Sequence, residues 1–266
     1  MAYTTKGEGA RPLRVLFWDI ELSPIICRTW SLYPDKLNHT DIIEDWRIIS
    51  AAWKWADSNV IESTHWAPTA DKQVSPVLGK DDTRVIKKLH SVLSQADVIV
   101  GHNSDNFDWK KFQTRCIELG LTPVAQKASV DTLKVARKEF KFTSNRLDYI
   151  GEKLGVGGKM DTPKGLHDDV IWSKPGALKI MLEYNKRDVE LLEGVYKRLK
   201  PYIRNHPAIH HSTDAEHLHC PKCGNENIQK RGVRVLKHFL RQEYQCQGCK
   251  SWMRGKAVAK ANLGAS

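Results

Sequence analysis

The sequence predicts an α/β domain followed by a small cysteine-rich module. Along most of the chain, short apolar runs typical of buried strands alternate with segments whose apolar residues recur at helical spacing. Near the C-terminus, two Cys-x-x-Cys pairs lie close together in a basic segment. A chain of 266 residues, 41% of them hydrophobic, can bury one substantial core and still carry such a module.

The first half of the body contains most of the predicted strands. Residues 14–20 form an apolar run that suits a central strand covered on both faces. Val85, Leu89 and Leu93 recur at helical spacing and predict a helix over residues 82–93. The remaining strands of this half are predicted at residues 25–32, 48–55, 60–66 and 97–101.

The second half is mainly helical. A helix over residues 108–119 is closed by Gly120 and Pro123, and a long helix begins near Pro175 and continues to Lys200, where Pro201 ends it. Between them we expect a short strand at residues 129–132 and helices at residues 133–140 and 147–154.

The predicted elements divide the chain into five parts. The segment after Pro201 contains two prolines and no clear periodicity, which is typical of a linker. The expected parts are a flexible N-terminus at 1–12, the α/β domain at 13–203, a linker at 204–217, the cysteine module at 218–255 and a basic tail at 256–266.

Charge is distributed unevenly. The net charge is +11, and the segment from His217 onward has ten basic and two acidic residues, whereas residues 1–216 have 32 basic and 29 acidic residues. A basic end on a nearly balanced body indicates a nucleic-acid contact surface, although a solubilising tail is the alternative.

No run of about 18 apolar residues occurs, and the N-terminus lacks the apolar stretch of a signal peptide. We therefore expect a soluble, intracellular and cytoplasmic protein with no membrane partner.

Two acidic residues end the first predicted strand. Asp19 and Glu21 alternate with Ile20, so both side chains leave the same face of that strand. Adjacent like charges raise each other's pKa unless a cation lies between them. Two acids that merely end a strand at the protein surface are the alternative.

Two further acids lie in helical apolar stripes. Asp108 aligns with Phe112 and Cys116, although capping of the helix would also explain it, and Asp105 is the better candidate for a plain cap. Asp188 lies one turn after Tyr184 on an apolar face of the last helix, where it needs either a cation or a salt bridge from elsewhere in the chain.

Taken in order, these segments resemble the three motifs of the 3′-to-5′ exonucleases of the DEDD superfamily. In particular they resemble the exonuclease domain of family B DNA polymerases, where the second motif has the form Asn-x-x-x-Phe-Asp. A tyrosine four residues before the last aspartate is typical of the DEDDy branch, and family B enzymes usually have Pro-Tyr where this chain has Trp109-Lys110. The matching residues are Asp19 and Glu21, then Asn103, Phe107 and Asp108, then Tyr184 and Asp188.

The resemblance implies a ribonuclease H-like mixed sheet flanked by helices and a site for two Mg²⁺ or Mn²⁺ ions. Asp19 would bridge both ions, Glu21 and Asp188 would complete the ion on the nucleophile side, and Asp108 would serve the other. Tyr184 would orient the attacking water. Asn103 and Phe107 would contact the nucleic acid.

The implied activity is metal-dependent 3′-to-5′ hydrolysis of single-stranded nucleic acid, DNA favoured over RNA. A structure-directed endonuclease and a non-catalytic nucleic-acid-binding protein are the alternatives. Because no polymerase segment is visible in the sequence, a polymerase or replication protein would act as a partner in trans.

The cysteine module has the spacing of a structural metal site. Cys220 and Cys223 are separated by 22 residues from Cys246 and Cys249, and four thiolates at such spacing suit one tetrahedral Zn²⁺. Disulfides are the alternative, and His219 is a minor rival ligand. The module resembles a zinc ribbon, with one strand-like stretch at residues 233–240.

The module also has residues suited to a polyanion. The expected nucleic-acid contacts are Lys230, Arg231, Arg234, Lys237, Arg241 and Trp252. Docking of a protein partner is the alternative use of a zinc ribbon.

Histidines outside these motifs are expected to lie in exposed loops. The group His167-Asp168-Asp169 looks like a solvated turn before the last helix, with contact to the substrate as the alternative, and the linker histidines look exposed.

Overall fold

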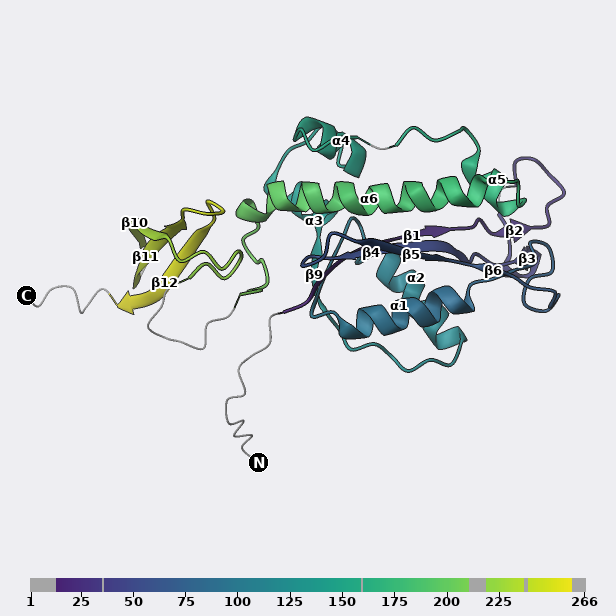
Figure 1. Ribbon diagram of the computed structural model, residues 1–266, viewed down its shortest axis with the longest axis horizontal. Helices are drawn as coiled ribbons and strands as arrows, with labels where there is room; N and C mark the ends of the chain where they lie inside the picture. The colour runs from purple at the N-terminus through teal and green to yellow at the C-terminus, as the bar shows by residue number, and fades with distance from the viewer. Residues whose placement is uncertain (1–12, 35, 159, 211–218, 237–238, 260–266) are drawn as a thin grey trace, which may run out of the picture.

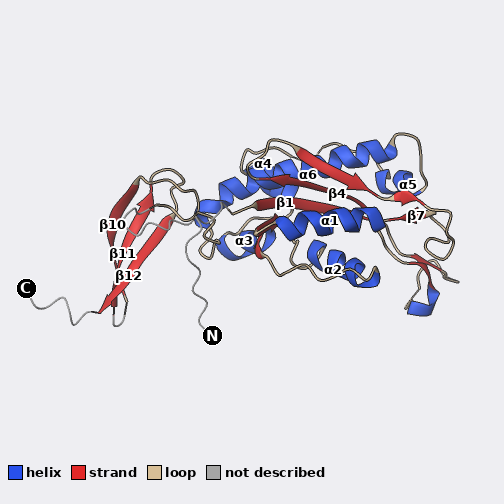
Figure 2. Ribbon diagram, turned by 60° about the horizontal axis from the view of Figure 1, so that its bottom comes forward, coloured by secondary structure: helices blue, strands red, loops and turns tan. Residues whose placement is uncertain are grey.

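The computed structural model describes residues 13–34, 36–158, 160–210, 219–236 and 239–259. Its main domain is a mixed five-stranded sheet in the order β5-β4-β1-β8-β9, with helices on both faces (Figures 1 and 2). β1 is antiparallel to β4 and parallel to β8. The strands are β1 Val15–Leu22, β4 Ile48–Trp55, β5 Ile61–His65, β8 Val98–Gly101 and β9 Ala128–Asp131. The expected α/β architecture is confirmed.

Helices form a layer on each side of the sheet. In both views α6 lies on one side of the sheet, while α1 and α2 lie on the other (Figures 1 and 2). No helix among the described residues is both long and apolar enough to cross a membrane. The helices are α1 Thr83–Gln95, α2 Asp108–Glu118, α3 Thr132–Glu139, α4 Leu147–Lys153, α5 Leu166–Ile171 and α6 Ala177–Leu199.

The central strand β1 is buried on both faces. Its residues Val15 and Phe17 pack into a core that includes residues of α3, α4 and α6. Leu16 and Trp18 pack into a second core that includes residues of α1 and α2. Because side chains alternate along a strand, the two faces are separated as the sequence predicts, and the strand is held firmly up to its acidic end.

The strand expected at residues 25–32 is mostly absent. Only β2 Ile26–Cys27 forms, paired with β3 Ile42–Glu44, and Trp30 and Tyr33 beyond it are 97% and 89% exposed. The physical reason is that both edges of β1 are already paired with β4 and β8, so the segment that follows cannot pair beside β1, and β2 pairs with β3 instead. Short elements that the sequence did not indicate are η1 His39–Asp41, β6 Ala67–Pro68, β7 Lys80–Asp81 and η2 Lys200–Tyr202.

The C-terminal module is a three-stranded antiparallel sheet made of β10 Ile228–Val235, β11 Phe239–Cys246 and β12 Trp252–Ala259. The single strand expected at residues 233–240 is therefore wrong, because the chain turns between β10 and β11 and pairs Val235 with Leu240. β12 also continues past the expected module boundary at residue 255. The expected N-terminal segment 1–12 and the tail from residue 260 lie outside the described residues.

Lys222 joins the C-terminal module to the chain just after α6. Its ammonium donates hydrogen bonds to the carbonyl oxygens of Lys200, Pro201 and Ile203 at 3.3, 3.2 and 2.8 Å, and the residue is only 7% exposed. The last carbonyls of a helix lack intrahelical partners and carry partial negative charge, which a buried ammonium offsets. The module is therefore anchored to the helix that also carries Asp188.

The expected linker is partly packed against the domain. His206 was expected to be exposed, but its Nε2 lies 2.7 Å from the hydroxyl oxygen of Tyr196, and the side chain is only partly exposed. Ile209 packs against the core that contains α6. The apolar surface at the end of α6 explains why this part of the linker is packed and not exposed. Residues 211–218 of the expected linker lie outside the described part of the chain.

Replacing Lys222 by methionine should destabilise the junction. The variant leaves three carbonyl acceptors without their charged donor, which should lower the free energy of unfolding by about 1.5–3 kcal/mol. Urea unfolding measures this change. The exposed Lys250, replaced in the same way, serves as the control and should change stability little. Equal midpoints for both variants would contradict the anchoring role.

Acid should destabilise the protein partly through His206. The pKa of His206 is lowered from 6.5 to about 4, chiefly by burial and in part by the nearby charges of Lys200 and Lys222, while a hydrogen bond with the Pro207 carbonyl opposes the shift. A depressed histidine pKa means that the unfolded chain binds more protons, so stability is intact above about pH 6.5 and falls as the pH drops toward 4. Unfolding midpoints should fall less steeply with decreasing pH in His206→Gln than in the unmodified protein across that range. A slope unchanged by the substitution would contradict this account.

Candidate functional site

Three carboxylates meet where β1 ends beside α6. Asp19 and Glu21 lie near the end of β1, and Asp188 projects from α6 with 6% of its surface exposed. One carboxylate oxygen from each lies within 4.8 Å of the others. Three negative charges at this separation repel one another strongly unless a cation lies among them. Carboxylate oxygens are hard ligands, so this set could bind Mg²⁺ or Mn²⁺.

Asp19 is oriented by a buried amide that the sequence reasoning missed. The Nδ2 of Asn185 donates to Asp19 Oδ2 at 2.7 Å, and the hydroxyl of Ser50 on β4 donates to Asn185 Oδ1 at 3.0 Å. Both Asn185 and Ser50 are fully buried. The signal available in the sequence was an amide at helical spacing between Met181 and Val189, on an apolar face of the helix where it needs a polar partner.

Asp108 approaches the same strand end from a different helix. Its Oδ1 accepts a hydrogen bond from the backbone N–H of Ile20 at 3.2 Å, between the two acids of β1. The pKa of Asp108 is raised to about 7, chiefly by burial and in part by the nearby charges of Glu21 and Asp131, while hydrogen bonds from backbone N–H groups oppose the shift. Asp108 adjoins the group of three carboxylates but is not part of it.

His167 lies beside Glu21. Its Nε2 is 3.1 Å from Glu21 Oε2, and the imidazole is half exposed. The sequence predicted a solvated turn here, but residues Leu166–Ile171 form α5. The prediction was wrong because Leu166, Val170 and Ile171 supply a buried stripe that Gly165 and Pro163 obscured in the sequence.

The second motif forms a tight turn before α2. Asn103 has a left-handed backbone with φ of 65°, and its N–H donates to Asp131 Oδ1 at 2.9 Å. Phe107, at the N-cap of α2, is 40% exposed. Asp105 does not cap α2 as expected, because its carboxylate accepts hydrogen bonds from Ser129 and Lys134 instead.

Tyr184 lies one turn before Asp188 on α6. The ring is partly exposed and packs against a small core that includes residues of α5 and α6. The spacing places its hydroxyl on the same side of the helix as Asp188. The acids and the tyrosine of the three motifs therefore lie on the predicted strand and helices, while Asn103 and Phe107 lie in the turn between β8 and α2.

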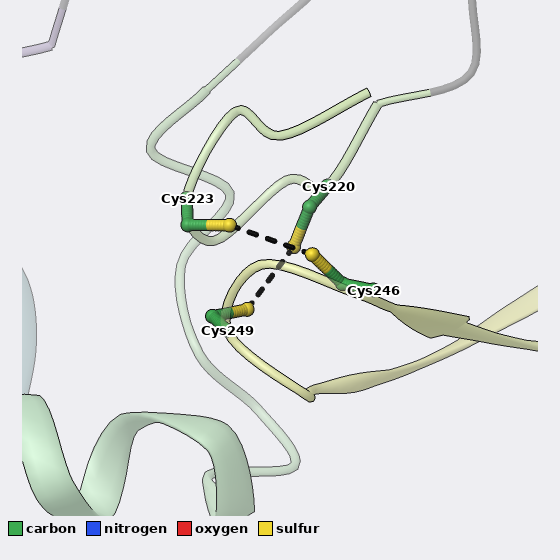
Figure 3. Close-up of side chains that lie close together, drawn as sticks. All are labelled: Cys220, Cys223, Cys246 and Cys249. Carbon is green, nitrogen blue, oxygen red and sulfur yellow. Dashed lines mark hydrogen bonds between the residues drawn. The ribbon is translucent and has the colours of Figure 1, made fainter. Parts of the chain in front are cut away.

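Four cysteines converge at the base of the C-terminal sheet (Figure 3). The sulfur atoms of Cys220 and Cys249 are 3.6 Å apart, as are those of Cys223 and Cys246, and all four cysteines are free thiols. A tetrahedral Zn²⁺ with bonds of about 2.3 Å sets neighbouring sulfur atoms about 3.8 Å apart.

Zinc is consistent with the thiols as well as with the spacing. Burial raises the pKa of the Cys223 thiol to about 12, so four thiolates would not persist here without a cation. The cluster therefore suggests a structural zinc site of the zinc-ribbon kind. His219 hydrogen-bonds to the His210 carbonyl instead of joining the cysteines.

The expected nucleic-acid contacts of the ribbon are distributed over its three strands. Lys230, Arg231 and Arg234 on β10 are exposed, Arg241 on β11 is partly exposed, and Trp252 on β12 is 54% exposed. Lys237 lies outside the described residues.

Changing one zinc ligand should remove the metal. We expect about one zinc atom per chain by elemental analysis. Cys220→Ser should abolish zinc retention and unfold the small sheet, because a module of this size depends on its metal. Cys27→Ser is the control and should keep its zinc, since Cys27 lies outside the cluster. Full zinc retention by the Cys220 variant would rule out the site.

Replacing Asn185 by leucine should weaken Mn²⁺ binding without unfolding the domain. Loss of a hydrogen bond that orients a metal ligand typically reduces metal affinity by about 10–100-fold. Calorimetric titration with Mn²⁺ measures this effect, and Ser50→Ala should show a smaller reduction. Unchanged Mn²⁺ affinity in folded Asn185→Leu protein would show that the amide has no positioning role.

Comparison with known proteins identifies a matching family and a solved structure of similar fold. A family model of the RNase H superfamily matches residues 66–200, a span that contains Asp108, Tyr184 and Asp188 but begins after the acids of β1. None of the curated proteins matches the chain.

A solved structure is similar in fold. It is a family B DNA polymerase from the hyperthermophilic archaeon Pyrobaculum calidifontis, with a TM-score of 0.54 and 24% sequence identity. The match covers 74% of this chain and 26% of the polymerase chain, so the chain spans about a quarter of that protein.

These findings confirm the expected RNase H-like mixed sheet and its similarity in fold to a family B DNA polymerase. The family model covers more than half of the 266 residues and includes the helix that carries Tyr184 and Asp188. The chain belongs to the RNase H superfamily.

Proposed function

We propose that the protein is a metal-dependent 3′-to-5′ exonuclease that hydrolyses phosphodiester bonds at the ends of single strands. The observation that carries the proposal is the meeting of Asp19, Glu21 and Asp188 within 4.8 Å in a nuclease-superfamily fold. Asp108 adjoins them through the N–H of Ile20. Such a concentration of partly buried negative charge faces a polyanionic substrate favourably only with cations present.

The four carboxylates are the proposed ligands for two Mg²⁺ or Mn²⁺ ions. When bound, the two ions would activate a water and stabilise the charge that develops on the leaving 3′ oxygen. Asp19, Glu21 and Asp188 would hold one ion, while Asp19 and Asp108 would hold the other. Asn185 keeps the Asp19 carboxylate in one orientation through the 2.7 Å hydrogen bond.

Tyr184 is proposed to orient the attacking water. Its hydroxyl is the polar group that the helix presents one turn from Asp188, and a hydrogen bond to the water would align it with the scissile phosphate. This role favours the DEDDy type of exonuclease. The half-exposed His167 lies on α5 and not on the helix that carries Asp188, and its imidazole contacts Glu21.

The substrate is proposed to be a single-stranded 3′ end, DNA before RNA. The exposed ring of Phe107 and the side chain of Asn103, both on the turn before α2, are suited to contact the terminal nucleotides. A polymerase or replication protein acting in trans is the proposed partner.

Substitutions in the carboxylate group should remove activity. Asp19→Asn and Asp188→Asn should each lower kcat by at least about 10²–10³-fold, because each removes charge that would hold a cation. Tyr184→Phe should lower kcat by about 10²-fold and leave KM nearly unchanged. Single-turnover hydrolysis of a 5′-labelled single strand with Mg²⁺ or Mn²⁺ measures both effects.

Asp168→Asn is the matched control, since Asp168 is an exposed acid of α5 outside the carboxylate group. Unaltered hydrolysis by the Asp19 and Asp188 variants would refute the site. Cleavage of circular single-stranded DNA would show an endonuclease, and metal-independent binding without any product would show a binding protein. Matched DNA and RNA strands in the same assay compare the two substrates.

A further inference from the structure

Strand register divides the side chains of the ribbon between two faces. β11 is the middle strand, and residues paired across an antiparallel sheet share a face. On one face Arg241 is opposite Arg234, and Trp252 is opposite Gln245. Arg254 lies on this face as well, opposite Glu243. We call Arg234, Arg241, Arg254 and Trp252 the arginine face.

The other face is mainly apolar. Leu240 is opposite Val235, and Tyr244 lies between Lys230 and Met253. This face continues to Cys246 and so to the zinc cluster. Lys230 therefore points away from the arginine face, although the sequence alone grouped it with Arg234 and Arg241.

The arginine face is electrostatically unfavourable for the ribbon itself. Like charges directly opposite each other on neighbouring strands destabilise a sheet, and Arg234 and Arg241 are such a pair. Among the described residues, Arg241 Nε is buried without a hydrogen-bond partner. Within the same part of the chain, neither arginine forms an ion pair with a carboxylate. The exposed guanidinium of Arg234 and the partly exposed side chain of Arg241 thus have no carboxylate partner in the described part of the chain, which favours an external anion.

We propose that the arginine face binds the phosphate backbone of single-stranded nucleic acid, with Trp252 stacking on a base. Guanidinium groups match phosphate geometry and stay charged. The indole of Trp252, 54% exposed on the same face, offers a sequence-tolerant stacking surface. The inference rests on the proposed function for its ligand class only, since binding requires no hydrolysis.

The position of the ribbon adds a length requirement. Lys222 anchors it at the end of α6, and twelve residues of helical rise separate Asp188 from Lys200, which is about 18 Å. A stacked strand rises about 3.4 Å per nucleotide. A strand must therefore be longer than about five nucleotides to occupy both the carboxylate site and the arginine face.

The test uses the full-length chain made inactive by Asp19→Asn, with a fluorescent 30-nucleotide oligothymidylate and binding followed by anisotropy across a KCl series. The salt slope is the steepness with which the logarithm of affinity falls as the logarithm of salt concentration rises. Each phosphate contact on a single strand contributes about 0.7 to this slope, which is about fivefold in affinity between 1 M and 0.1 M salt. Arg234→Gln with Arg241→Gln should lower the slope by about 1.4. Trp252→Ala should weaken binding about tenfold with an unchanged slope.

Lys230→Gln is the matched control for Arg241→Gln, because each removes one positive charge from the same sheet but from opposite faces. The lysine variant should keep the slope of the parent. Zinc content verifies folding, and Arg241→Gln should have an equal or higher melting temperature, because it relieves repulsion from Arg234. An equal decrease of the salt slope in the lysine and arginine variants, or no decrease in either, would overturn the assignment.

Hydrolysis separates this inference from the proposed function. In the otherwise unmodified chain, Arg234→Gln with Arg241→Gln should reduce kcat/KM on the 30-nucleotide strand and leave a trinucleotide unaffected. Reduced kcat/KM on both substrates would overturn the length requirement. If the unmodified chain hydrolyses neither substrate, the proposed function fails, while the anisotropy series still decides whether the arginine face binds nucleic acid.

Discussion

Mutual repulsion among carboxylates at the end of β1 is the constraint on which the rest of the structure depends. Asp19, Glu21 and Asp188 lie within 4.8 Å of one another, and Asp108 adjoins them. Such an arrangement survives folding only because the elements that hold it cannot separate. β1 is buried on both faces, and α6 packs along one of them. The stability of the two cores thus holds the charges close enough to share cations.

The long helix α6 connects the chemistry to the rest of the molecule. Near its middle it presents Tyr184, Asn185 and Asp188 to the end of β1, and at its C-terminus it receives the ammonium of Lys222. The ribbon is therefore attached to the helix that positions the site. A nucleic acid held by the ribbon would be held at a defined distance from the carboxylates, which gives the small module a role in presenting the strand.

Sequence periodicity predicted the main sheet and most helices because their apolar patterns are fixed by burial. It failed for the segment around Trp30, which follows β1 but cannot pair beside it, because β4 and β8 already occupy both edges of that strand. It also divided the ribbon wrongly, because the sequence has no Gly, Pro, Asn or Asp between the end of β10 at Val235 and the start of β11 at Phe239 to indicate that a strand ends there.

The carboxylates and cysteines of the candidate sites could be predicted because spacing alone defines them. The contribution of Asn185 could not be, since its partners Ser50 and Asp19 are distant in sequence. The contact between His167 and Glu21 was hidden for the same reason. The separation of Lys230 from Arg241 likewise depends on strand register, which composition does not reveal.

Anomalous diffraction from crystals grown with Mn²⁺ and a nucleoside monophosphate would test the central claim most directly. The account predicts two manganese peaks, one among Asp19, Glu21 and Asp188 and the other between Asp19 and Asp108. Absence of manganese from these carboxylates, in crystals that bind it elsewhere on the chain, would contradict the account.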